Sequence, residues 1–358
     1  MKRLTNKIQN YAWGSTSAIP SLLGVAPDGK PQAELWCGAH DSAPSLAGAE
    51  PLNELIAKAP VRLLGERVAK RFDGRLPFLL KVLAAAQPLS LQAHPSLAQA
   101  REGFARENAA GIPLNAPHRN YRDANHKPEI ICALSEFHAL CGFRRVGDSV
   151  RLLSALGVEV TILEREGLKA FFTHVMTERM SLSEVRDVEG FANESALART
   201  LVKAYPGDPG IIGALLLNYV VLQPGEALFL NAGNLHAYLD GTGIELMANS
   251  DNVLRGGLTP KHVDVAELLR VLDFTDGPVK VWRDSYDAPI DDFRLSRLEV
   301  EGSTPLPSAA QILLVTSGAA TLAGETLNQG DSVFVGADET GLTLSGRATV
   351  FRATSGIL

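Results

Sequence analysis

The chain has 358 residues, of which 46% are hydrophobic and 21% are charged, and its formal net charge at pH 7 is −6. This length exceeds the usual size of one hydrophobic core, so two or three domains are expected. An acidic chain without a basic block makes nucleic acid and anionic membranes poor partners. No apolar run approaches about 18 residues and no secretory segment follows the Met-Lys-Arg start, so we expect a soluble, cytoplasmic protein.

The three cysteines indicate a reducing compartment. Cys37, Cys132 and Cys141 are odd in number and lack CxxC spacing, so we interpret them as free thiols that form neither a disulfide framework nor a cysteine zinc site. The 32 glycines and 20 prolines are scattered along the chain, which is typical of many turns between short strands.

The first part of the chain, through Gly38, is turn-rich, and its Trp13 is either a lid over a pocket or simply a buried aromatic residue. Residues 51–72 carry apolar positions interrupted by Pro60, which predicts short helices. Residues 77–84 form an apolar run that contains Lys81. Lysine is rarely buried without a partner, so Lys81 either reaches an edge or, as we favour, faces a polar cavity.

A short polar row follows in residues 89–95. Read as a strand, this stretch places Ser90, Gln92 and His94 on one face and aliphatic residues on the other. Gln92 and His94 would lie about 6–7 Å apart along such a strand, which lets both reach one metal ion. The alternative is a polar face that only meets solvent.

After a predicted helix over residues 96–111, a lysine and an acid precede another apolar run. Pro128 holds the residue before it in an extended conformation, so Lys127 and Glu129 can point to the same side. An acid at the mouth of a buried strand needs a partner or a metal, although a surface Lys/Glu pair is the alternative.

Residues 146–205 change to helical periodicity, and strand patterns resume near residue 215. The sequence Gly-Glu-Ala-Leu-Phe-Leu at residues 225–230 then returns as Gly-Asp-Ser-Val-Phe-Val at residues 330–335. Eleven residues after each first glycine stand His236 and Gly341. Such repeats are typical of cupin jelly rolls, so we expect a mainly β protein with two barrels, the first with a metal and the second without.

The expected division has three parts. Residues 1–145 plus 206–275 would form a discontinuous catalytic cupin domain, residues 146–205 a helical insertion domain, and residues 276–358 a metal-free cupin-like domain.

Four residues are candidate metal ligands: Gln92, His94, Glu129 and His236. Two imidazoles, one carboxylate and one amide suit Zn²⁺ with a position left open for water or substrate. With one carboxylate against a dication the site stays positive, which favours an anionic or oxygen-rich ligand. Spacing alone does not establish the metal.

Five blocks taken together resemble the type I mannose-6-phosphate isomerases. They are Tyr-Ala-Trp-Gly at 11–14, Gln-Ala-His-Pro at 92–95, Asn-His-Lys-Pro-Glu at 125–129, Asn-Ala-Gly-Asn-Leu-His-Ala-Tyr at 231–238, and the block 249–261. The likeness runs to about residue 275, and the connector 102–108 resembles the bacterial branch. Residues 276–358 match only in general character.

The resemblance implies zinc held by the four candidate ligands, and polar active-site residues at Ser90, Lys127, Glu245, Asp251 and Arg255, with Trp13, Lys81 and Tyr238 nearby. Ser90, Trp13, Lys81 and Tyr238 are the expected substrate contacts. Residues 95–97 read Pro-Ser-Leu where many eukaryotic members carry an acid and a lysine, so contacts taken from those members do not transfer. One zinc per chain, a sugar-phosphate substrate and a monomer are expected.

The implied reaction interconverts mannose 6-phosphate and fructose 6-phosphate through a cis-enediol. Asp251 and Arg255 are spaced i, i+4, which predicts one helical turn. Arg255 suits an enediolate or a phosphate, since its charge persists and its donors are planar. We expect Arg255 to stabilise charge, with Lys127, Asp251 and Glu245 as rival proton carriers between which the sequence does not choose.

Two other classes of protein are alternatives to an isomerase. A cupin dioxygenase would hold Fe(II), usually with more histidines, and a non-catalytic sugar-phosphate-binding cupin would keep the pocket without proton carriers. Within the isomerases, other sugar phosphates stay open as substrates.

Overall fold

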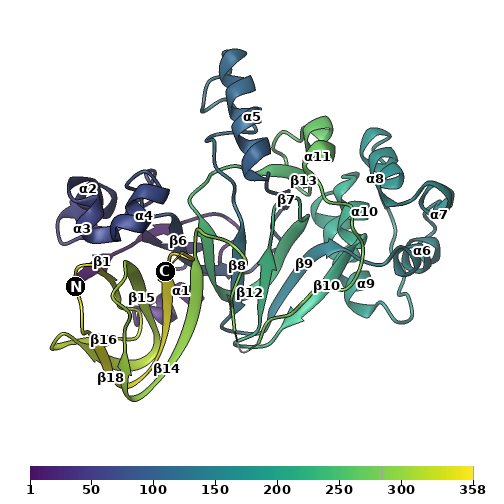
Figure 1. Cartoon of the computed structure of the whole chain (residues 1–358). Helices are drawn as coiled ribbons and strands as arrows, with labels where there is room; N and C mark the ends of the chain where they lie inside the picture. Colours follow the sequence, from purple (N-terminus) through teal and green to yellow (C-terminus); the bar gives the residue numbers. More distant parts are fainter. Residues whose placement is uncertain (284, 358) are drawn as a thin grey trace.

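Strands dominate the computed structural model, which describes residues 1–283 and 285–357 (Figure 1). Asp284 and Leu358, which fall in the predicted C-terminal domain, lie outside the described residues. The described strands form one ten-stranded and one eight-stranded sheet, and the strand pairs within both are antiparallel. The prediction of a mainly β fold is confirmed.

The ten-stranded sheet is organised around one long strand, β12 (His236–Ala248). Its first half pairs with β7 and β9, and its second half, from Gly241 on, lies between β6 and β8. The other strands of this sheet are β2 (Lys7–Gln9), β3 (Glu34–Gly38), β6 (Phe78–Ala85), β7 (Leu91–Ala93), β8 (Glu129–Ala133), β9 (Phe137–Phe143), β10 (Leu217–Leu222), β11 (Ala227–Leu230) and β13 (Leu254–Gly257). β12 is therefore the strand that connects the two halves of this sheet.

Short helices follow the first strands, as predicted. They are α1 (Ala18–Leu22), α2 (Leu52–Lys58), α3 (Pro60–Leu64) and α4 (Glu66–Arg71). Pro60 opens α3 at its first position, where a missing N–H costs nothing. The longer helix α5 (Leu97–Ala109) starts at a capping box in which Ser96 and Gln99 exchange hydrogen bonds.

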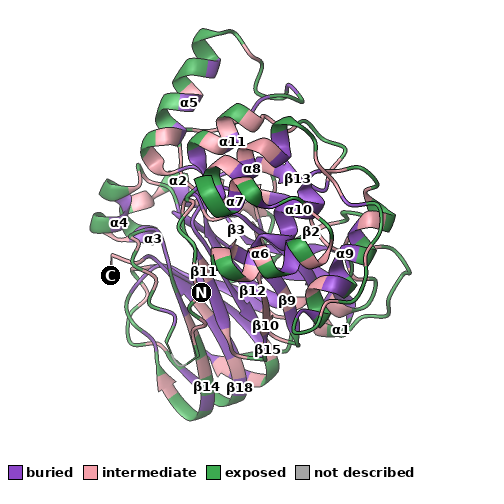
Figure 2. Cartoon of the chain, turned by 90° about the vertical axis from the view of Figure 1, so that its right-hand side faces the viewer, coloured by how far each residue is buried: buried purple, intermediate pink, exposed green. Residues whose placement is uncertain are grey.

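The expected helical segment is present beside the ten-stranded sheet (Figures 1 and 2). It contains α6 (Val146–Ala155), α7 (Thr161–Glu166), α8 (Leu168–Thr177) and α9 (Ala192–Ala204), and α10 (Gly210–Leu215) and α11 (Val265–Val271) lie close to it. Phe171 and Leu201 share a buried cluster with Leu91 and Ala93 of β7, so the helices support the strand that carries Gln92. Among the described residues, no helix is long and apolar enough to cross a membrane.

The eight-stranded sheet combines the two ends of the chain. Its strands are β1 (Lys2–Thr5), β4 (Leu46–Ala47), β5 (Glu50–Pro51), β14 (Arg294–Pro305), β15 (Gln311–Leu322), β16 (Glu325–Asn328), β17 (Ser332–Val335) and β18 (Thr343–Thr354). Lys2 of β1 lies opposite Phe334 of β17. The first residues therefore join the sheet of the C-terminal segment, which the predicted boundary at residue 276 did not foresee; the three-domain division itself stays a prediction.

The sequence repeat corresponds to a repeated turn. Gly225 and Gly330 both adopt positive φ, +89° and +87°, which glycine tolerates without strain. The acid after each glycine accepts a hydrogen bond from a backbone N–H three residues earlier: Glu226 from Gln223 at 2.9 Å and Asp331 from Asn328 at 2.8 Å. The same turn leads into β11 in one sheet and β17 in the other.

Candidate metal centre and substrate site

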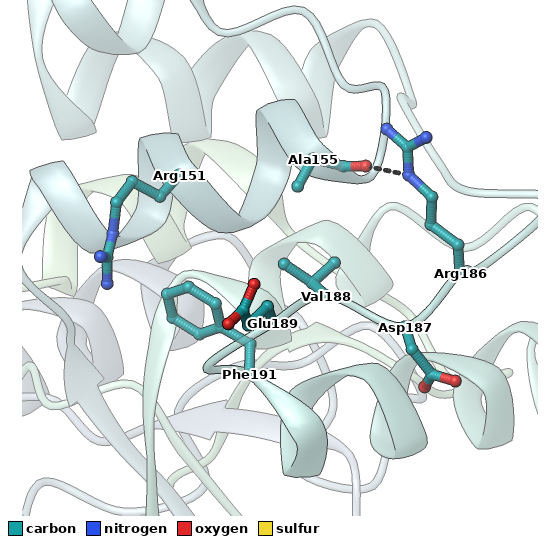
Figure 3. A pocket seen from close by; sticks show the side chains of 7 residues that line it. All are labelled: Arg151, Ala155, Arg186, Asp187, Val188, Glu189 and Phe191. Carbon is teal, nitrogen blue, oxygen red and sulfur yellow. Dashed lines mark hydrogen bonds between the residues drawn. The ribbon is translucent and has the colours of Figure 1, made fainter.

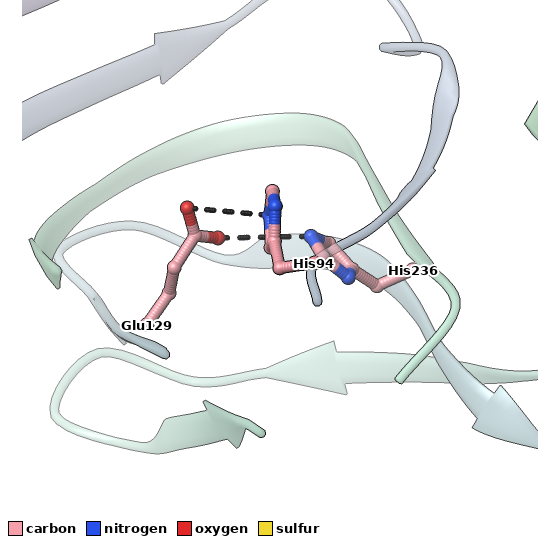
Figure 4. A group of neighbouring side chains, drawn as sticks. All are labelled: His94, Glu129 and His236. Atoms are coloured by element: carbon pink, nitrogen blue, oxygen red, sulfur yellow. Dashed lines mark ion pairs between the residues drawn. The ribbon is translucent and has the colours of Figure 1, made fainter. Parts of the chain in front are cut away.

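Two imidazoles and one carboxylate meet inside the ten-stranded sheet (Figure 4). His94 follows β7, Glu129 opens β8 and His236 opens β12. Nε2 of His94 lies 3.5 Å from one carboxylate oxygen of Glu129, and Nε2 of His236 lies 3.6 Å from the other. All three side chains are buried, and one ligand atom from each lies within 4.8 Å of the others.

Backbone carbonyls fix how the two imidazoles are presented. Nδ1 of His94 donates to the carbonyl of Asn252 at 2.7 Å, and Nδ1 of His236 donates to the carbonyl of Asn234 at 3.0 Å. Because a carbonyl only accepts, the proton of each neutral ring is on Nδ1 and the lone pair of Nε2 faces Glu129.

The inward-facing atoms lack partners. Nε2 of both histidines and Oε2 of Glu129 are buried and have no hydrogen-bond partner among residues 1–283 and 285–357. Buried polar atoms without partners are costly, and a divalent cation bound between them would remove that cost. The donor set therefore fits the metal that the sequence predicts.

The local charges agree with this fit. Burial lowers the pKa of His94 to about 4, so the ring is neutral near pH 7. Burial alone would raise the pKa of Glu129, but the neighbouring Lys127 and His94 outweigh it and hold that pKa well below its usual range. Neutral imidazole and ionised carboxylate are the forms that bind metal.

Gln92 and Arg255 belong to the same row as His236. In the strand register, Gln92 lies opposite His236 on one side and opposite Arg255 on the other. Residues directly opposite each other in antiparallel strands project from the same face, so these three side chains leave one face of the sheet. Gln92 as a fourth ligand stays a prediction.

The predicted helical turn over Asp251 and Arg255 is wrong. Asp251 lies in a loop, and Arg255 is in β13, where pairing with β7 overrides the i, i+4 pattern. A Cβ on Gly257 would lie 2.6 Å from the Cα of Gly210, so this glycine is needed for close packing against α10.

Lys81 lies in a buried ion cluster and not at a solvent-exposed edge, while the polar cavity stays a prediction. Its Nζ is 3.0 Å from Glu245 Oε2, 3.8 Å from Glu34 Oε1 and 5.2 Å from the centre of the Trp36 ring. Burial alone would lower the pKa of Lys81, but Glu245 and Glu34 reverse this effect and raise it. Lys81 is therefore held as an ammonium group, while burial raises the pKa of Glu245.

Lys127 and Asp251 differ in their surroundings. Lys127 is buried, with Nζ 2.8 Å from Glu129 Oε1. Asp251 has a side chain that is 47% exposed, and its Oδ1 is 3.6 Å from Nε2 of His40. Burial lowers the pKa of His40, so this contact involves a neutral imidazole near pH 7. Of the two, Lys127 is the one beside the candidate metal group.

The predicted substrate contacts lie at different depths. Tyr238 is buried, its hydroxyl has no hydrogen-bond partner in the part of the chain that the structure describes, and burial raises its pKa. Its ring centre is 6.0 Å from that of His236. Trp13 is half-buried and stacks on exposed Tyr11 at 5.7 Å, and Ser90 is half-buried just before β7.

Sequence reasoning missed a group of cations beside Arg255. Burial and then Arg122 lower the pKa of Arg255, and burial, Arg255 and Arg122 lower that of Lys261, so the three positive charges interact. Within residues 1–283 and 285–357, none of the three forms an ion pair within 4.0 Å. A signal was present, because Lys261 ends the block that contains Arg255.

Two surface hollows lie apart from these residues. One, of about 340 Å³, is formed in the helical segment by α6 and the loop before α9, with Arg151, Arg186 and Phe191 among its lining residues (Figure 3). The other, of about 220 Å³, lies between Gly225 and strands β15 and β18. Neither contains a predicted site residue.

The fold and the buried group together define a mainly β protein with a candidate metal centre. Residues 1–146 match the family model described as phosphomannose isomerase type I, catalytic domain. The mannose-6-phosphate isomerase of Salmonella typhimurium is 40% identical over 98% of this chain and 99% of its own, and that of Escherichia coli K12 is 41% identical over the same shares. A crystal structure of mannose 6-phosphate isomerase bound with zinc and yttrium superposes with a TM-score of 0.88 at 40% identity, covering 99% of each chain.

The chain belongs to the type I phosphomannose isomerase family.

Proposed function

We propose that this protein catalyses the reversible isomerisation of mannose 6-phosphate and fructose 6-phosphate with one zinc ion per chain. The observation that carries the proposal is the buried His94, Glu129 and His236 group with its unpartnered, inward-facing atoms. The names of the full-length relatives and the zinc in a similar structure support it.

The zinc would be held by His94, Glu129 and His236, with Gln92 as the fourth ligand. A bound zinc ion supplies a Lewis acid that stabilises negative charge developing on the C1 and C2 oxygens of the sugar. Tautomers already fixed by the carbonyls of Asn252 and Asn234 would spare the site any reorganisation when the ion binds.

The three candidate proton carriers differ in how far their side chains are buried. Moving a carbon-bound proton requires a group shielded from water, and both Lys127 and Glu245 are buried whereas Asp251 is exposed. Glu245 has a raised pKa, as a base working near neutral pH needs. We therefore assign proton transfer to Glu245 and Lys127, and to Lys81 the role of holding Glu245 at 3.0 Å.

The cations would bind the anionic parts of the substrate. Arg255 shares a face with Gln92 and is placed to stabilise charge on the enediolate. Arg122 and Lys261, which lack ion-pair partners among the described residues, would hold the phosphate. Half-buried Trp13 and Ser90 and buried Tyr238 would contact the sugar.

The finer expectations also belong to this proposal. We propose that the enzyme acts as a monomer in the cytoplasm. Light scattering of the zinc-loaded protein at working concentration would give a single-chain mass if this is correct.

The direct experiment combines metal analysis with a coupled assay on mannose 6-phosphate. The expected result is one zinc per chain, isomerase activity, loss of both after dialysis against a chelator, and recovery with zinc. A zinc-loaded chain without turnover on either sugar phosphate would contradict the proposal, and oxygen consumption instead would indicate a dioxygenase.

A further inference from the structure

The side chain of Asn252 uses its full hydrogen-bonding capacity on one short segment. Asn252 is fully buried in the loop between β12 and β13. Its Oδ1 accepts from the backbone N–H groups of Arg122 at 2.7 Å and Asp123 at 3.2 Å. Its Nδ2 donates to the backbone carbonyls of Asp123 at 2.9 Å and Asn125 at 2.8 Å. An amide offers two acceptor positions and two donors on a short side chain, so alanine or aspartate cannot reproduce this set.

The backbone of the same residue serves the candidate metal centre. The carbonyl of Asn252 accepts the hydrogen bond from Nδ1 of His94 at 2.7 Å, which directs Nε2 toward Glu129. One buried residue thus joins His94 to the segment 122–125.

Residues that the proposed reaction needs lie in that segment or just after it. Arg122 belongs to the cation group, and Lys127 and Glu129 follow Asn125 by two and four positions. The carboxylate of Asp123 adds a second connection, since it accepts from the hydroxyl of Ser250 and from the backbone N–H of Asp251, both at 2.8 Å. A shift of 122–125 would move these groups relative to His94.

We propose that Asn252 is a positioning residue that locks segment 122–125 to His94, so that the metal ligands and the substrate-binding cations are held as one unit. The inference rests on the proposed function for its consequences in catalysis. Its primary readouts, metal retention and amide exchange, do not depend on any substrate.

Asn234 offers a matched control. Its carbonyl holds Nδ1 of His236 at 3.0 Å, as that of Asn252 holds His94. Its side chain, by contrast, accepts only from the Sγ of Cys141 at 3.6 Å, which is a weak contact. Truncating the two side chains therefore separates the effect of the amide network from that of the carbonyl.

The experiment compares zinc-loaded wild type with Asn252→Ala, Asn252→Asp and Asn234→Ala. Zinc release to a competing chelator, hydrogen exchange of the Arg122 and Asp123 amides, kcat and KM would be measured. Changes to partners that orient metal ligands typically cost about 10–100-fold. We expect Asn252→Ala to speed zinc loss by a factor in that range, expose both amides and lower kcat.

The aspartate variant tests the donors separately. It keeps two acceptors for the amides of Arg122 and Asp123 but leaves the carbonyls of Asp123 and Asn125 unpaired, so an intermediate effect is expected. Asn234→Ala should resemble the wild type in every readout.

Two results would overturn the inference. One is unchanged zinc release and amide protection in Asn252→Ala or, should that variant not fold, in Asn252→Asp. The other is an equal loss in Asn234→Ala. Wild type that holds zinc but lacks isomerase activity would instead contradict the proposed function alone.

Discussion

The two sheets share a turn and one buried cluster, to which Ile244 of the first and Ile312 of the second contribute, but they differ in what else they bury. Gly225 and Gly330 start the same turn with nearly equal φ, and each turn is followed by a short strand and then a long one, β12 or β18. The first sheet carries the buried group of His94, Glu129 and His236, at the ends of β7, β8 and β12. The second sheet encloses an aliphatic cluster: Val300, Leu306, Leu313, Val315, Ala320, Leu322, Leu327, Val333, Val335, Leu344, Ala348 and Val350.

The difference shows which buried residues bind a ligand and which only stabilise the fold. Buried polar atoms without partners destabilise a fold, so their presence indicates a bound ligand that offsets this effect. An aliphatic interior stabilises the fold without any ligand. At the equivalent position, His236 is buried and Gly341 is exposed with φ +68°. The repeat therefore preserves the glycine-acid turn, whereas eleven residues later His236 opens β12 and Gly341 lies two residues before β18.

The largest effect is expected from removing a ligand of the first sheet. His236→Ala, and likewise His94→Ala, should lose bound zinc and nearly all activity, because each removes one of the two neutral nitrogen donors. Metal analysis after dialysis and the coupled assay check this. A His236→Ala protein with stoichiometric zinc and near-normal turnover would remove this site from consideration.

Arg255→Ala should separate charge stabilisation from metal binding. Zinc content and melting temperature should stay near wild type, while turnover falls by on the order of 10²–10³, as on removal of one charge-stabilising donor. Arg255→Lys should recover part of the loss, since it keeps the charge but not the planar fork. A loss confined to KM would assign Arg255 to phosphate binding instead.

A core substitution in the second sheet should lower the stability of the protein and leave its catalytic rate unchanged. Leu344 is fully buried in its aliphatic cluster, so Leu344→Ala should lower the free energy of unfolding by about 2–5 kcal/mol. Denaturant unfolding measures this change, and kcat per bound zinc should be unaltered. A fall in zinc affinity with unchanged stability would contradict the separation of roles.

The smallest effect concerns metal stoichiometry. With Gly341 where the first copy has His236, residues 276–358 should add no tightly bound ion, so dialysed wild type should hold one zinc and His236→Ala none. A second ion that survives dialysis would end the proposed contrast.

Local sequence was sufficient for features fixed by local physics. Pro60 divided the short helices, and the glycine-acid pairs predicted the repeated turn, because each depends on backbone preferences within a few residues. The polar row at Gln92 and the position of Glu129 depended on strand alternation, which is equally local.

Features that depend on distant pairing were missed or wrong. A polar environment for Lys81 could be argued from the cost of burying an ammonium group, but Glu34 reaches Lys81 only through the β3–β6 register. The predicted helical turn over Asp251 and Arg255 is wrong because Arg255 pairs with β7 as part of a strand. The role of Asn252 depends on hydrogen bonds to residues about 130 positions away, which no local pattern encodes.

The pairing of β1 with β17 has a consequence for how the protein is made. Lys2 leaves the ribosome long before its strand partner Phe334, which follows it by 332 residues. The edge of β1 that faces β17 must therefore wait, with its backbone groups unpaired, until β17 has been synthesised, although β4 can pair with β1 earlier. Such distant contacts slow folding, because a long loop must close before they form. Any nascent chain stopped before residue 332 would keep an open edge that can pair with another chain.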